Sequence, residues 1–180
     1  TYKDNKQTTI TPNPVDATGW AQQPGVSKSG VLNNNIVTWT IKINLGDYKQ
    51  QYNSLADFLG TTGSIIEEPE QNGSTLCDST GTPLSNNKID ASAFTDNGDG
   101  TYTATVYTKV TDEYMDSVAQ AEVTNKVKVT NNKGYTYEGN YSVRTPGKNW
   151  QINKTAGQYD KATNMISWTV KIPNVPKGIE

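Results

Sequence analysis

Apolar and polar residues alternate along three segments of the chain, and a period of two predicts β-strands. Residues 36–44 place Val37, Trp39, Ile41 and Ile43 on one face and polar side chains on the other. The same alternation runs through the segments 101–110 and 119–130. Further strands are expected near residues 26–32, 64–68, 84–90 and 134–143.

Turn-forming residues separate these segments, and single helical turns fit at Ser54 to Leu59 and Asp112 to Met115. Short strands divided in this way favour an all-β fold, specifically an Ig-like β-sandwich. Its core should contain seven side chains from the apolar faces of the strands: Val37, Trp39, Ile41, Val106, Val123, Val127 and Val129.

An internal repeat divides the chain. The segment Ile36-Val37-Thr38-Trp39-Thr40-Ile41-Lys42-Ile43 recurs as Met165-Ile166-Ser167-Trp168-Thr169-Val170-Lys171-Ile172, and Lys154 is the upstream counterpart of Lys28. We therefore expect a tail of a preceding unit or a linker over 1–19, one complete domain over 20–148, and the start of a second repeat over 149–180. This incomplete second repeat should be extended and poorly packed, because it cannot bury Trp168, Ile166 and Val170.

Composition excludes several classes of function. The chain has no His and one Cys, so histidine-dependent catalysis and an intramolecular disulfide are excluded. A formal net charge of −2 does not favour nucleic acid as a partner. No apolar run is long enough for a membrane span. We expect no enzyme, no cofactor and no metal site.

Two local motifs have ordinary structural explanations. The segment Asp96-Asn97-Gly98-Asp99-Gly100 resembles the start of a calcium loop, but the twelfth position, which requires Glu, is Tyr107 on a strand. A hairpin turn explains the segment better. The tyrosines Tyr135, Tyr137 and Tyr141 share one face of a late strand, and they could form a platform for a sugar or a peptide.

Three polar residues fall at positions expected to be apolar. Asn125 interrupts the face shared by Val123 and Val127, Asp57 lies among Leu and Phe residues, and Lys28 follows Val26 in phase. A buried amide without a partner costs about 1–3 kcal/mol, so these groups need one another. They form either an ordinary hydrogen-bonded network or a reactive group.

The reaction open to them is a self-crosslink. Burial lowers the pKa of a lysine and raises that of an aspartic acid, which favours a neutral amine beside a protonated acid. The amine of Lys28 can attack the side-chain amide of Asn125, and Asp57 can transfer protons while ammonia leaves. The rival amine, Lys42, has the parity of an outward-facing side chain.

At these residues the chain resembles a known family. The segments Val37-Thr38-Trp39-Thr40-Ile41-Lys42-Ile43-Asn44, Leu55-Ala56-Asp57, Tyr107-Thr108-Lys109-Val110-Thr111-Asp112-Glu113 and Val123-Thr124-Asn125 are similar to collagen-adhesin-type (Cna-like) domains of Gram-positive surface proteins. The resemblance covers about 20–148. It implies an Ig-like domain with an intramolecular isopeptide bond, in which Lys28 is the amine, Asn125 the amide donor and Asp57 the assisting acid.

The resemblance implies a structural stalk or adhesin domain at the bacterial cell surface, attached to the cell wall, with neighbouring repeats of the same protein as partners. The alternative is an adhesin module that binds a host extracellular-matrix protein or a glycan. A carbohydrate-binding module associated with a glycosidase is a third interpretation. Exposed aromatic side chains in a concave surface would favour the two binding interpretations.

Overall fold

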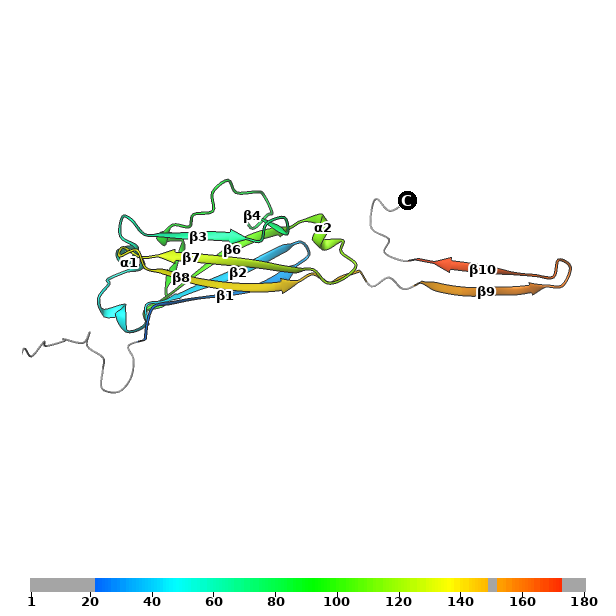
Figure 1. Ribbon diagram of the computed structural model, residues 1–180, viewed down its shortest axis with the longest axis horizontal. Coiled ribbons are helices and arrows are strands. Elements are labelled where there is room, and N and C mark those ends of the chain that lie inside the picture. The colour runs from blue at the N-terminus through cyan, green and yellow to red at the C-terminus, as the bar shows by residue number, and fades with distance from the viewer. Residues whose placement is uncertain (1–21, 149–151, 173–180) are drawn as a thin grey trace, which may run out of the picture.

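The computed structural model describes residues 22–148 and 152–172 as two antiparallel β structures (Figure 1). The predicted tail 1–19 and the ends of the predicted segment 149–180 lie outside the described residues. The strands confirm an all-β fold. In the part of the chain that the structure describes, no helix is long and apolar enough to cross a membrane.

The larger sheet contains five strands. Its order is β1 (Gly25–Asn33), β2 (Ile36–Asn44), β6 (Thr101–Val110) and β4 (Ser74–Cys77), and the short β5 (Thr95–Asp96) also pairs with β6. All neighbours are antiparallel, and Trp39 of β2 lies opposite Gly30 of β1 and Val106 of β6. The strands predicted over 36–44 and 101–110 are therefore both confirmed.

The smaller sheet has the order β3 (Ser64–Pro69), β7 (Glu122–Thr130) and β8 (Thr136–Arg144). Alternate residues of β7 are buried, which is the period that its sequence predicted. Figure 1 shows this sheet lying against the larger one, with β8 beside β1. At that seam, a Cβ atom on Gly139 would lie 2.8 Å from the carbonyl oxygen of Val26, so the close approach of β8 to β1 requires glycine.

Short helical turns connect the strands. They are η1 (Gly46–Gln50), α1 (Leu55–Leu59), η2 (Ala91–Ala93) and α2 (Asp112–Met115), and the turns predicted near 54–59 and 112–115 are α1 and α2. Helix α1 buries Leu55, Phe58 and Leu59 against the open end of the two sheets.

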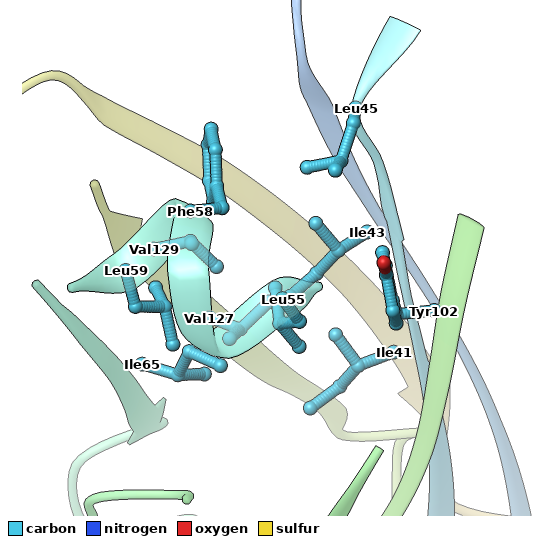
Figure 2. Close-up of a cluster of buried hydrophobic side chains, with 10 residues drawn as sticks. All are labelled: Ile41, Ile43, Leu45, Leu55, Phe58, Leu59, Ile65, Tyr102, Val127 and Val129. Carbon is cyan, nitrogen blue, oxygen red and sulfur yellow. The ribbon is translucent and has the colours of Figure 1, made fainter. Parts of the chain in front are cut away.

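Apolar side chains from both sheets meet in two core clusters. Figure 2 shows the larger cluster, in which Ile41 and Ile43 of β2 face Val127 and Val129 of β7 under helix α1. The smaller cluster consists of the buried side chains of Val37, Trp39, Val110, Val123 and Val143. The predicted core residues are buried, except that Val106 is only partly buried.

One predicted strand is wrong, and two observed strands, β4 and β5, were not predicted. Residues 84–90 form no strand, although backbone hydrogen bonds and the single bridges Ile66–Lys88 and Cys77–Pro83 join this irregular region to β3 and β4. Of the two apolar side chains in this segment, Leu84 is exposed and Ile89 is partly buried against the core, so the segment has no alternating apolar face that would favour a strand. Strand β4, which was not predicted, ends at the buried Cys77.

The described part of the predicted second repeat is a separate hairpin of β9 (Asn153–Asp160) and β10 (Met165–Lys171). Every side chain of residues 152–172 is exposed, including Trp168, which is 54% exposed. This stretch is therefore extended and without a packed core, as its sequence predicted.

A substitution at Gly30 tests the packing of Trp39. A Cβ atom on Gly30 would lie 2.4 Å from Cε3 of Trp39, whereas one on Gly25 would have no neighbour within 4 Å. We expect Gly30→Ala to lower the free energy of unfolding by about 1–3 kcal/mol, because the indole must move. Gly25→Ala is the matched control, and equal urea midpoints for the two variants would contradict this packing.

Candidate crosslinking site

Lys28 enters the space between the sheets from β1. Its Cα lies opposite Ile41 of β2, and its side chain has no exposed surface. The ammonium nitrogen lies 5.5 Å from the centre of the Trp39 ring, within the range of a cation–π contact. The prediction that Lys28 points inward is confirmed.

Asn125 and Glu67 enter the same space from the opposite sheet. Asn125 lies in the middle of β7 and is completely buried. Glu67 lies on the neighbouring β3, is 1% exposed, and pairs with Val127, two residues along β7 from Asn125. Because residues two apart on a strand share a face, both side chains project toward Lys28.

One carboxylate oxygen joins the three residues. Nζ of Lys28 donates to Oε2 of Glu67 at 2.5 Å, and Nδ2 of Asn125 donates to the same oxygen at 2.7 Å. The other two oxygens of the group, Oε1 of Glu67 and Oδ1 of Asn125, are buried without a hydrogen-bond partner. Such orphaned acceptors are rare in folded proteins, so this group carries an uncompensated polar cost.

Burial shifts the pKa values of both ionisable members toward neutrality. Removal from water lowers the pKa of Lys28 below its usual value, and the nearby Glu67 carboxylate only partly opposes this. Removal from water likewise raises the pKa of Glu67, against the opposing effects of Lys28 and Asn125. A neutral amine and a neutral carboxylic acid are the forms that this environment favours.

The backbone of Glu67 is held by an irregular segment of the chain. Its N–H donates to the carbonyl of Asn87 at 2.8 Å, and the side-chain amide of Asn87 donates back to the carbonyl of Glu67 at 3.1 Å. These two bonds pair the free edge of β3 and fix the strand that carries the acid.

Asp57 does not take part in this group, so its predicted place in the core is wrong. It is exposed on helix α1, where its N–H donates to Oγ of Ser54 at 3.1 Å and its Oδ2 accepts from the N–H of Asn53 at 3.0 Å. These bonds cap the helix, and Leu55 and Phe58 occupy the buried face instead. The sequence Ser54-Leu55-Ala56-Asp57 carries the signal of such a capping arrangement.

Sequence reasoning missed Glu67 because β3 reads Ile65-Ile66-Glu67-Glu68. Each face of this strand carries one isoleucine and one glutamate, so alternation could not tell which glutamate is buried. The structure turns Glu68 outward, where it pairs with Lys126 at 2.8 Å and Lys128 at 3.3 Å. Two lysines on the outer face of β7 were the available signal.

The other candidate residues lie elsewhere. Lys42 is exposed on the outer face of β2, as predicted. Asn97 to Gly100 forms the tight connection between β5, which ends at Asp96, and β6, as a hairpin turn requires. Within 22–148 and 152–172, no three His, Cys, Asp or Glu side chains gather as metal ligands.

A hollow of about 510 Å³ lies near the start of β1, beside helix α1. Its wall contains five aromatic rings together with amide and ammonium groups: Tyr48, Tyr52, Phe58, Tyr135, Tyr137, Gln23, Asn131 and Lys133. Of the three tyrosines predicted to share a face, Tyr135 and Tyr137 line this hollow and Tyr141 does not.

The buried acid predicts a pH dependence in the variant Lys28→Met. Without the cation, the pKa of Glu67 rises further above its ordinary value of 4.5. When folding raises the pKa of an acid, the contribution of that acid to stability is fully present below its unfolded-state pKa. This contribution is lost as the pH rises through the folded-state pKa. Urea unfolding from about pH 4 to about pH 8 should show this loss.

The control for this measurement is Lys28→Met/Glu67→Gln, which keeps the shape of the acid but cannot ionise. The difference in stability between the two variants should widen as pH rises. Parallel pH profiles would show that Glu67 is not a buried titrating group.

No protein family, curated protein or solved structure matches this chain in comparisons of sequence and fold.

Proposed function

We propose that Lys28 and Asn125 form an intramolecular isopeptide bond, with Glu67 as the assisting acid. The observation that carries this proposal is the single oxygen of Glu67 that binds both nitrogens inside the core. The neutral amine attacks the amide carbon of Asn125, a new carbon–nitrogen bond forms, and the bond to Nδ2 breaks. Glu67 accepts a proton from the amine and delivers one to the departing ammonia.

The two orphaned oxygens support this assignment of the acid. A protonated Glu67 has a hydroxyl donor on one oxygen, and Oδ1 of Asn125 lacks a donor. Nδ2 of Asn125 already donates to Glu67, which holds the two side chains together. Protonation of Glu67 would supply the hydrogen bond that Oδ1 of Asn125 lacks. A hydrogen bond to Oδ1 polarises the amide carbonyl and favours attack at its carbon.

We propose that the chain is a structural stalk domain of a bacterial cell-surface protein, of Ig-like topology and anchored to the cell wall. Its resemblance to collagen-adhesin-type domains and its internal repeat support this function. It turns over no substrate, because the crosslink consumes its own side chains once. Its partners are neighbouring repeats of the same protein.

Intact mass tests the crosslink. The wild-type chain should weigh about 17 Da less than its sequence, because one ammonia leaves. A tryptic digest should contain one branched peptide that joins the Lys28 segment to the Asn125 segment. The monomers of Lys28→Ala and of Asn125→Ala should each have the full mass of their own sequence.

The same measurement separates the two candidate acids. Glu67→Gln should have its full mass, because the proton carrier is gone, whereas Asp57→Asn should keep the loss of ammonia. Lys42→Ala is a control on the outer face of β2 and should also keep it. Circular dichroism checks that each variant retains its β structure. A wild-type chain of full mass would leave the three residues as a hydrogen-bonded network and overturn the proposal.

A second candidate function is adhesion to a host glycan or an extracellular-matrix protein, and the aromatic hollow favours it. Tyrosine faces suit the apolar faces of sugar rings, and Asn131 and Lys133 offer polar contacts at the same place. Binding to a glycan array and to immobilised collagen should be lost in Tyr135→Ala and kept in Tyr141→Ala. Equal binding by both variants, or none by the wild type, would exclude the hollow as the binding site.

A further inference from the structure

The exposed hairpin β9–β10 reproduces the hairpin β1–β2, whose inner face packs in the core. Lys154 lies opposite Val170, as Lys28 lies opposite Ile41, and Val170 is the repeat counterpart of Ile41. The ammonium of Lys154 lies 4.4 Å from the centre of the Trp168 ring, which matches the contact of Lys28 with Trp39. The position of the reactive amine is therefore preserved in the second hairpin.

The two hairpins differ in length, and the additional residues of the second lie in its turn and in a bulge between that turn and the lysine. The turn of the first hairpin contains Asn34 and Asn35, whereas the second turn contains the longer segment 161–164. A register shift then lies between Ile166 and Trp168 of β10, and it absorbs an additional residue of β9. Both turns include an Asn in the left-handed region, with φ of 54° at Asn34 and 55° at Asn164.

The face that packs in the first hairpin is also preserved in the second. Five apolar residues of β1–β2 lie toward the β3–β7–β8 sheet: Val26, Val37, Trp39, Ile41 and Ile43. Their counterparts in the second hairpin are also apolar and are, in the same order, Ile152, Ile166, Trp168, Val170 and Ile172. All five counterparts are at least 45% exposed. An exposed apolar face of this kind marks an interaction surface.

We infer that β9–β10 is a docking surface for the β3–β7–β8 sheet of a second copy of this chain, where it takes the place of β1–β2. This sheet is the surface that fits the same set of side chains in the structure itself. Copies joined in this way would form a head-to-tail chain, because the two contacting surfaces differ.

The geometry favours a second copy over the chain's own sheet. In its own sheet, Ile152 would have to lie beside Gly139, where Val26 lies. Residues beyond β8 are tied to the far end of β7, through Thr145 N–H to the carbonyl of Ala121 at 2.9 Å and Lys148 N–H to that of Ser117 at 3.1 Å.

The four residues from Lys148 to Ile152 span at most about 14 Å when fully extended. The strand from Arg144 back to Gly139 alone spans about 17 Å. Docking in the same chain would therefore break the bonds that hold residues 145–148.

The covalent step between copies rests on the proposed function. The neutral amine of Lys154 attacks the amide carbon of Asn125 in the second copy, a carbon–nitrogen bond forms, and Nδ2 leaves as ammonia. Glu67 of that copy transfers the protons. No oxidant or other reactant is needed.

The test uses the full chain with Lys28→Ala, which leaves Asn125 without its own amine. The variant is unfolded in urea and refolded over a series of concentrations, and the products are separated on a denaturing gel and weighed. We expect a covalent dimer about 17 Da lighter than two chains. Its fraction should rise with concentration, and its branched peptide should join the Lys154 and Asn125 segments.

Lys28→Ala/Lys154→Ala should form no covalent dimer, whereas Lys28→Ala/Lys161→Ala, which changes a lysine in the turn, should form it as before. If the wild type loses ammonia but Lys28→Ala forms no dimer, docking is overturned and the intramolecular crosslink stands. A monomer with a Lys154–Asn125 bond would show docking in the same chain and would overturn the role of the second copy.

If the wild type keeps its full mass, the proposed function fails and docking is judged without a covalent bond. Light scattering of refolded Lys28→Ala should then show dimers that Trp168→Lys in the same background abolishes. Dimers that persist in that double variant, or their absence from both, would overturn the docking surface.

Discussion

The carboxyl group of Glu67 lies inside an apolar core, where it needs polar partners, and the two sheets supply them. An isolated buried carboxylate is too costly to persist, so it must be neutralised, paired or hydrogen-bonded. Lys28 supplies the pairing from one sheet and Asn125 the hydrogen bond from the other. The same contact that satisfies the acid also brings an amine to an amide.

This polar group divides the core in two. Val123 belongs to one apolar cluster and Val127 to the other, with Asn125 between them on β7. On β2, Trp39 and Ile41 divide in the same way, next to Lys28. The apolar clusters on both sides exclude water from the group, which sustains the pKa shifts of Lys28 and Glu67. The packing of the core therefore maintains the pKa shifts on which the proposed reaction depends.

Alternation predicted the elements whose two faces differ in polarity. Strands β2, β6 and β7 were predicted closely, and so were the buried positions of Lys28 and Asn125, because each breaks a regular pattern. The acid could not be found in this way, since each face of β3 carries one isoleucine and one glutamate. Asp57 was misassigned because apolar neighbours in sequence were read as apolar neighbours in space, although a helical turn directs them to different sides.

Lys28 lies near the start of β1, the first strand of the two packed sheets, and Asn125 lies in β7, the strand before the last one. A tension applied at Gly25 and Arg144 would pass through a bond between them and bypass residues 29–124. At about 3.4 Å per residue, that segment stores roughly 300 Å of chain that could not be drawn out. A linkage at this position would limit the extension of the domain to the residues outside that segment, chiefly the end of β7 and β8, whatever the strength of the hydrogen bonds within it.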